Sequence, residues 1–498
     1  MGVIIRQGFK AAISNYIGLV LGFVSLFILF PLFFEPGELG AIRIFLELAT
    51  ILSAFALMGT NYSINRYFPY FKTKDQNHHG FFFWAFILPL VGYMILLFTL
   101  WLFGDKFFTF INPEAGKYKA LLPVLLSLIL IILYQNVVEV ACANHGRTAV
   151  PNFMKEVVMR SLIIVSGTLF YLNILTFSQT VWAITICYFI AFLGSLIFLS
   201  KLTKITLKPD FEFIKQNKQL KTEIIKFTIY LFFSGALALV IPKIDFILIS
   251  SIKKDLALVA VYSIGFYLAT FIEVPKRTIL QIAIPIISGH MKNEHYHEVK
   301  QLNKKNGTNQ LIISGILFFM IWLNIDNLYA IMPKGDYYAQ GKWVVFFIGL
   351  SKMIDALFSG NGPIIANSKF YAWAMITMIL AAFFGILFNY ILISNYGIMG
   401  GAISTILVMI IVNVYNLLLV QFKLKINPFE KNQLKLIAVL IVFFALSFTG
   451  NWLENPYLDS IVRSIFFGIL LLIVLIKSNI SKEFNQLVSS KLPQSMRF

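Results

Sequence analysis

Long apolar segments alternate with short polar loops along the whole chain. A helix needs about 20 predominantly apolar residues to cross the hydrocarbon core of a bilayer. By that criterion the sequence predicts an all-α, polytopic membrane protein with about fourteen transmembrane helices and no inserted soluble domain. The expected spans are 11–33, 39–64, 80–104, 118–141, 153–173, 179–200, 224–251, 257–288, 309–332, 341–365, 369–393, 397–421, 433–449 and 458–476.

The segment 239–290 has the most informative pattern, because it predicts two long apolar helices joined by a short charged turn, Lys253-Lys254-Asp255. Each helix is interrupted by a proline, Pro242 in the first and Pro275 in the second. A proline inside a span frees a backbone carbonyl, which is tolerated where helices pack together or line a cavity. We therefore expect this segment to lie inside the helix bundle.

An internal repeat divides the chain into two related halves. Shifted by 220 residues, 14–50 aligns with 234–270 without a gap and preserves the helix–turn–helix spacing. We expect an N-terminal lobe over 1–200, a cytoplasmic linker over 201–223, a C-terminal lobe over 224–422, and two further helices with a cytoplasmic tail over 423–498. The identical positions are Ser14, Leu19, Val20, Ile44, Leu48, Ala49 and Thr50.

Composition excludes a soluble globular protein, since 58% of residues are hydrophobic, 13% are charged and the mean hydropathy is +0.80. A net charge of +18 would suggest nucleic acid as the partner of a soluble protein. Here most lysines lie in short loops between apolar segments, so membrane lipids with anionic headgroups are the expected partner and nucleic acid is not.

The distribution of basic residues predicts the orientation of the chain. The side that holds both termini carries 25 lysine and arginine residues in or beside its loops, and the opposite side carries seven. Because basic loops stay on the cytoplasmic side, both termini are expected in the cytoplasm.

Candidate cofactor and metal chemistry is sparse. Cys142 and Cys187 lie in or beside apolar segments and are interpreted as packing residues. His290, His295 and His297 cluster in a lysine-rich loop, where a solvated loop is favoured over a metal site. No nucleotide-binding or hydrolase motif occurs, so we expect no cofactor, no metal and no catalytic residues.

Charged residues inside the expected spans are the candidate functional residues, because each costs about 2.5–3.5 kcal/mol at a helix centre. The basic ones that remain after the loop residues are counted are Arg43, Lys155, Arg160, Lys226, Lys243, Lys276, Arg277, Lys352 and Arg463. The acids at comparable depth are Glu47, Glu139, Glu156, Asp245, Glu273 and Asp355.

Spacing along the helices predicts local ion pairs for some of these residues, namely Arg43–Glu47, Glu273–Arg277 and Lys352–Asp355. Others lie near enough to span ends for their heads to reach the membrane surface, and they receive no role: Lys155, Lys226 and Arg463. Two interpretations stay open for the rest, a water-filled cavity between the halves or structural pairs buried between helices. The candidate substrate-binding residues are Arg43, Glu47, Lys243, Asp245, Glu273, Lys276 and Arg277.

Four segments carry a resemblance to a known family: 35–71, 243–288, 324–371 and 397–413. They resemble the bacterial polysaccharide flippases of the multidrug/oligosaccharidyl-lipid/polysaccharide exporter superfamily. Asp245 matches an aspartate that recurs near the outer end of the seventh helix in that family, and 324–371 resembles its lipopolysaccharide-biosynthesis branch. The resemblance implies a two-lobed, MATE-like fold whose lobes expose a central cavity to each side in turn.

The same resemblance implies a function. The expected substrate is an oligosaccharide on a polyprenyl diphosphate, flipped across the bacterial inner membrane for surface polysaccharide, lipopolysaccharide or O-antigen assembly. A coupling ion, H⁺ or Na⁺, is a further partner that the resemblance leaves open. The alternatives are a multidrug exporter on the same fold and a membrane-embedded polysaccharide polymerase or ligase. Cationic drugs would be repelled by a basic cavity, and an enzyme would be expected to carry a longer external loop than 105–117.

The orientation can be tested with single cysteines and a membrane-impermeant thiol reagent. We expect labelling only from the cytoplasmic side at 75, 210, 295 and 430, because the basic loops stay inside. Labelling only from the periplasmic side is expected at 112, 254, 336 and 455. Two neighbouring sites on the wrong side would contradict the fourteen-span topology.

Overall fold

The computed structural model describes residues 2–73, 77–111, 121–370, 372–427, 429–481 and 484–486. All regular structure in these ranges is helical, in agreement with the expected all-α class. The chain divides into two compact units, 1–260 and 261–498. This boundary falls within a helix, and the predicted division into lobes at 201–223 stays a prediction. Six basic residues of the orientation tally lie outside the described ranges: Lys74, Lys117, Lys119, Lys482, Lys491 and Arg497.

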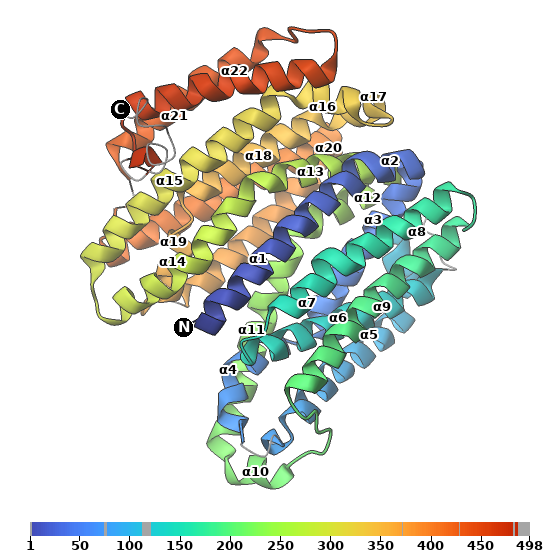
Figure 1. The fold of residues 1–498 in the computed structure, drawn as a ribbon. Coiled ribbons are helices and arrows are strands. Elements are labelled where there is room, and N and C mark those ends of the chain that lie inside the picture. The colour runs from blue at the N-terminus through green and yellow to red at the C-terminus, as the bar shows by residue number, and fades with distance from the viewer. Residues whose placement is uncertain are drawn as a thin grey trace. The chain divides into compact units, whose positions relative to one another are not determined.

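Unit 1 is a bundle in which α6 lies against α3, α4 and α9, and Figure 1 shows the short helix α10 beside one end of it. Its helices are α1 (Gly2–Phe23), η1 (Val24–Leu29), α2 (Phe30–Phe33), α3 (Pro36–Ala56), α4 (Thr60–Phe71), η2 (His78–Gly80), α5 (Phe81–Ile111), α6 (Leu122–Asn144), α7 (Ala149–Phe153), η4 (Met154–Val158), α8 (Met159–Tyr171), α9 (Phe177–Leu202), α10 (Phe211–Gln216), α11 (Lys218–Val240), η5 (Ile241–Lys243), α12 (Ile244–Lys253) and the start of α13 (Leu256–Thr270).

Unit 2 is built around α18, which packs on α15 and α20, while α21 and α22 lie along α15 (Figure 1). After the rest of α13, its helices are η6 (Phe271–Glu273), α14 (Val274–Lys292), α15 (Tyr296–Leu323), α16 (Ile325–Ile331), α17 (Gly335–Tyr338), η7 (Ala339–Gly341), α18 (Lys342–Leu357), α19 (Asn361–Ala366), α20 (Trp373–Leu424), α21 (Lys431–Leu446), η8 (Ser447–Thr449) and α22 (Pro456–Lys477).

Eleven helical segments in the described part of the chain are long and apolar enough to cross a membrane. One of them, α20, covers two expected spans and bends at Gly397, whose φ is +61°. The expected spans 153–173 and 341–365 are also largely helical but are not among the eleven. The first of these carries Lys155, Glu156 and Arg160 close together. The exact number of fourteen spans therefore stays a prediction.

The sequence predicted the break between the helices of segment 239–290 correctly. Helix α12 ends at Lys253, Lys254 has a φ of +55°, and α13 begins at Leu256. The two prolines also fall at breaks, because Pro242 lies in the 3₁₀ turn η5 and Pro275 lies in the first turn of α14, which follows the 3₁₀ turn η6. A proline has no N–H to donate to the preceding turn, so the regular α-helix stops there.

Apolar side chains from several helices form a separate core in each unit. In unit 1 the central helix α6 buries seven residues almost completely: Val124, Leu125, Leu128, Ile129, Leu133, Val137 and Val138. In unit 2, α15, α21 and α22 share a core of Leu311, Phe319, Leu436, Phe443, Phe467 and Leu471. These cores hold the helices that carry the charged candidates.

A close helix contact in unit 1 gives a test of the packing. A Cβ atom at Gly40 of α3 would lie 1.7 Å from the carbonyl oxygen of Leu256, whereas one at Gly37 would meet nothing within 4 Å. We expect Gly40→Ala to destabilise the protein by about 1–3 kcal/mol, since the added methyl forces α3 away from α13. Gly37→Ala, on the same helix, is the control and should be neutral or stabilising. Thermal unfolding of the purified protein in detergent measures both, and equal melting temperatures would contradict the contact.

Candidate functional site

The first charged cluster lies in unit 1 and is centred on Glu47, whose side chain is only 3% exposed. Arg43, one turn earlier on α3, approaches the Glu47 carboxylate to 2.8 Å. Lys243 from the break η5 binds the other carboxylate oxygen. The Arg43 guanidinium also lies over the ring of Phe246, 5.3 Å from its centroid. Two cations thus share one buried carboxylate.

The second cluster lies in unit 2 and has a similar centre. Glu273, in the break η6, accepts a hydrogen bond from Arg277 Nε at 2.9 Å and pairs with Lys352 of α18 at 2.6 Å. The Lys352 side chain is only 13% exposed, whereas the Arg277 side chain is 64% exposed. Removing Arg277 would therefore leave Glu273 with Lys352 as its partner.

A further ion pair joins the same two helices, Lys276 of α14 with Asp355 of α18. Spacing had predicted that Lys352 would pair with Asp355 on its own helix, and this prediction is wrong. Both α18 residues instead bind partners across the helix interface, Lys352 binding Glu273 and Asp355 binding Lys276. The reason is that α18 is a buried central helix, so its side chains meet the neighbouring helix before they meet each other.

All seven candidate residues are described, and they fall into these two groups. Unit 1 brings together Arg43, Glu47 and Lys243, with Asp245 buried in the first turn of α12 two residues beyond Lys243. Unit 2 brings together Glu273, Lys276 and Arg277. The local pairs predicted by spacing, Arg43–Glu47 and Glu273–Arg277, are both present. Whether these residues contact a substrate stays a prediction.

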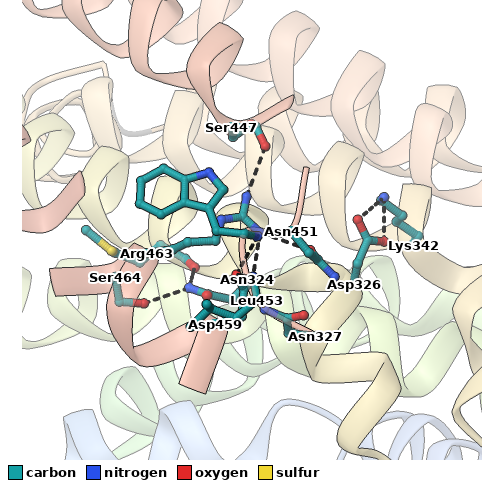
Figure 2. Close-up of polar contacts among 12 residues, drawn as sticks. Asn324, Asp326, Asn327, Lys342, Ser447, Asn451, Leu453, Asp459, Arg463 and Ser464 are labelled. Carbon is teal, nitrogen blue, oxygen red and sulfur yellow. Dashed lines mark hydrogen bonds and ion pairs between the residues drawn. The ribbon is translucent and has the colours of Figure 1, made fainter. Parts of the chain in front are cut away.

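Arg463 was expected to extend to the membrane surface, and the structure contradicts this. Its side chain is only 3% exposed and pairs with Asp459, one turn earlier on α22, at 3.3 Å. Figure 2 shows the guanidinium among polar groups, with Asn451 Oδ1 at 3.1 Å and the carbonyl oxygen of Ser447 at 3.3 Å. The segment 447–455 folds back over α22, so the arginine finds its partners inside the protein. Lys155 likewise has a protein partner, Glu139, at 3.3 Å.

Asp459 is the centre of this polar cluster, and the sequence analysis missed it. Its side chain is 0% exposed and accepts hydrogen bonds from the backbone N–H groups of Trp452 and Leu453, at 2.7 and 3.0 Å, and from the Asn327 amide of α16. A signal was available, since Asp459 precedes Arg463 by four residues. Its position near the span end concealed it. The cluster joins α16 to α22 and is structural in character.

A third polar group lies at the connector between α9 and α11. Asp210 Oδ1 accepts from the Phe213 N–H at 2.9 Å and so begins α10, and Asp210 Oδ2 lies 3.1 Å from His79 Nδ1. The Phe213 N–H, followed by the His79 hydrogen bond, lowers the pKa of Asp210. The stabilisation therefore holds above the ordinary pKa of an aspartate and is lost as the pH falls through the lowered value. No group of three histidine, cysteine or acidic side chains in the described part is placed to hold a metal ion.

The chain is similar to known proteins both in sequence and in fold. Residues 4–291 match the model of a family described as polysaccharide biosynthesis protein. No curated protein matches the chain. The fold is similar to that of the lipid II flippase MurJ in an inward closed conformation, with a TM-score of 0.69 and 14% identity, covering 95% of this chain and 100% of that one.

Two transporters have a similar fold over a smaller part of the chain. A multidrug resistance MATE family transporter, inward-facing, has a TM-score of 0.58 and 16% identity, covering 85% of this chain and 95% of that one. The Vibrio cholerae MATE transporter VcmN, in its bent form, has a TM-score of 0.52 and 13% identity, covering 85% and 98%. At these identities the likeness establishes the MATE-like fold.

The buried cluster of Figure 2 gives a stability test with a control in the same view. We expect Asp459→Asn to destabilise the protein by about 3–5 kcal/mol, because it leaves the buried Arg463 without its counter-charge. Asp326→Asn removes an acid that is 61% exposed and paired with Lys342 at 2.6 Å, so it should cost at most about 1 kcal/mol. Thermal unfolding in detergent compares the two. Similar losses would show that the Asp459–Arg463 pair is not the buried linkage described here.

Proposed function

Because the chain belongs to the family of polysaccharide biosynthesis proteins, we propose that it flips an oligosaccharide carried on a polyprenyl diphosphate across a membrane. The family and the proteins of similar fold are flippases and transporters, not enzymes, and this chain is a multi-pass membrane protein. The proposal adds the substrate class, the alternating exposure of a central cavity to each side, and a role in lipopolysaccharide assembly.

The observation that carries the proposal is the excess of cations over acids in the cluster around Glu273. In the first cluster Glu47 and the buried Asp245 balance the two cations Arg43 and Lys243. In the second cluster, three cations share two acids, Glu273 and Asp355. A diphosphate needs cationic partners, and charge-assisted hydrogen bonds to phosphate oxygens are among the strong polar interactions in proteins. The cluster in unit 2 thus holds one cation more than it holds acids.

Arg277 is the cation best suited to a phosphate. It is 64% exposed, while the lysines of the same cluster are largely buried. Only its Nε is used by Glu273, so both terminal nitrogens of the guanidinium are left to form a bidentate pair with phosphate oxygens. A substrate phosphate could therefore bind Arg277 without displacing the Glu273 carboxylate.

The same charges argue against a multidrug exporter, although transporters of that kind share the fold. Exported drugs are usually cationic, and the excess positive charge of the cluster around Glu273 would repel them. We further propose that the protein lies in the bacterial inner membrane with both termini in the cytoplasm, as its basic loops indicate. A coupling ion, H⁺ or Na⁺, stays a prediction.

Substitutions at Arg277 test the proposal. We expect Arg277→Ala to lower flipping by about tenfold or more, because a charge-assisted contact with substrate phosphate contributes about 1.5–3 kcal/mol. Arg277→Lys should lose only part of the activity, since it keeps the charge but not the fork of donors. Surface polysaccharide production in a cell that lacks its own flippase measures the effect, with the amount of each variant in the membrane measured alongside.

Two controls separate substrate binding from helix packing. Lys342→Ala removes a basic residue paired with the exposed Asp326 and should leave production unchanged. The double variant Glu273→Gln/Arg277→Leu should stay inactive although it inserts and accumulates normally, because removing the acid does not restore a phosphate ligand. Full activity in that double variant would overturn the role of Arg277 and leave the pair with a structural role only.

A further inference from the structure

A cavity of about 390 Å³ lies within unit 1, at the end of the bundle where α10 leads into α11. It is bounded by α4, α5, α10 and α11, and its walls are almost wholly apolar. Among the lining residues are Tyr67, Phe71, Phe81, Leu88, Phe211 and Ile224. A volume of this size falls within the range of about 300–1,000 Å³ that small-molecule and cofactor sites occupy.

The polar groups that line this cavity are few and include one cation. Trp84 also lines the cavity, but its indole Nε1 is buried away from it. Lys221 also lines the cavity, and Lys218 lies one helical turn before it on α11. The hydroxyl groups of Ser63 and Thr228 are 2.6 Å apart and satisfy each other. An occupant with a long hydrocarbon part and an acceptor-rich, anionic end would complement these walls.

The connector next to the cavity adds positive charge to the end of the cavity where Lys218 and Lys221 lie. Six lysines lie between 201 and 221, against two acids, Asp210 and Glu212. Asp210 is itself occupied, because it begins α10 and binds His79. The His79 ring stacks on Phe213 with 4.0 Å between centroids, so α10 is held against the bundle while Phe211 remains 63% exposed. An exposed phenylalanine among lysines is typical of a helix that lies in a membrane interface.

We propose that this cavity binds one anionic phospholipid of the surrounding membrane, with part of an acyl chain between α4, α5 and α11 and the phosphate near Lys218 and Lys221. The lipid would attach the connector and α10 to the membrane surface. This site involves none of the seven candidate substrate residues, so it is separate from the proposed transport function.

An anionic phospholipid is favoured over other occupants by two features. The lysines match the negative headgroups of a bacterial membrane, each contributing to binding near the surface. The apolar walls match a hydrocarbon chain rather than a sugar, which would need hydrogen-bond partners that these walls do not provide. A polyprenyl phosphate has similar chemistry, and the experiment below distinguishes it.

The test is native mass spectrometry of the delipidated, full-length protein titrated with dioleoyl phosphatidylglycerol or dioleoyl phosphatidylcholine. We expect the first phosphatidylglycerol to bind on the order of tenfold more tightly than the first phosphatidylcholine, and Lys218→Gln/Lys221→Gln to abolish that difference. The control Lys201→Gln/Lys204→Gln removes the same amount of charge from the same connector. It should keep the difference in affinity between the two lipids. Leu88→Trp fills the cavity and should weaken binding of both lipids.

Val91→Trp is the control for added bulk, because Val91 is an exposed residue of the same helix that does not line the cavity. The proposal is overturned if the two lipids bind the unaltered protein equally. It also fails if Leu88→Trp and Val91→Trp bind phosphatidylglycerol alike while both remain folded by circular dichroism. Displacement of phosphatidylglycerol by an equimolar polyprenyl monophosphate would assign the cavity to the transported carrier instead.

Discussion

A carboxylate shared by two cations is the interaction on which the charged interior of this protein depends. Glu47 and Glu273 each bind an arginine one turn away on their own helical segment and a lysine from a second helix. In hydrocarbon a single unpaired charge would be costly, so each acid makes the cations that it binds tolerable. Under the 220-residue shift that relates the halves, Glu47 aligns with Tyr267 and Glu273 with Ser53. The repeat itself therefore does not account for the similarity of the two arrangements.

Sequence alone was sufficient for features that are local along the chain. Apolar length predicted the helical spans, Lys253-Lys254-Asp255 predicted a turn, and two prolines predicted helix breaks. Spacing by four residues found the pairs Arg43–Glu47 and Glu273–Arg277. It could not find the partners of Lys352 and Asp355, because these depend on which helix packs against α18. The prediction for Arg463 was wrong for a related reason, since hydropathy does not reveal that segment 447–455 folds back over α22.

Not every buried charge in the chain points to transport. Around Asp459 and Arg463 each charge is matched by an opposite charge or by backbone donors, and the cluster sits where a loop meets two helices (Figure 2). Such an arrangement stabilises one geometry and leaves no capacity for an anionic ligand. The cluster around Glu273 differs in having a cation in excess, since Lys276, Arg277 and Lys352 meet only two acids. Surplus charge, rather than burial, thus distinguishes this cluster from the structural one.

Two ion pairs join η6–α14 to α18, Glu273 with Lys352 and Lys276 with Asp355, and they also limit how these helices can move. Along the first, an acid at 273 precedes a base at 276; along the second, a base at 352 precedes an acid at 355. Sliding one helix past the other by a turn would place Glu273 beside Asp355, and sliding it the opposite way would place Lys276 beside Lys352. Both displacements bring like charges together inside the hydrocarbon layer. The ion pairs therefore oppose sliding of these helices past each other. Any rearrangement that accompanies substrate movement has to carry them as one rigid body.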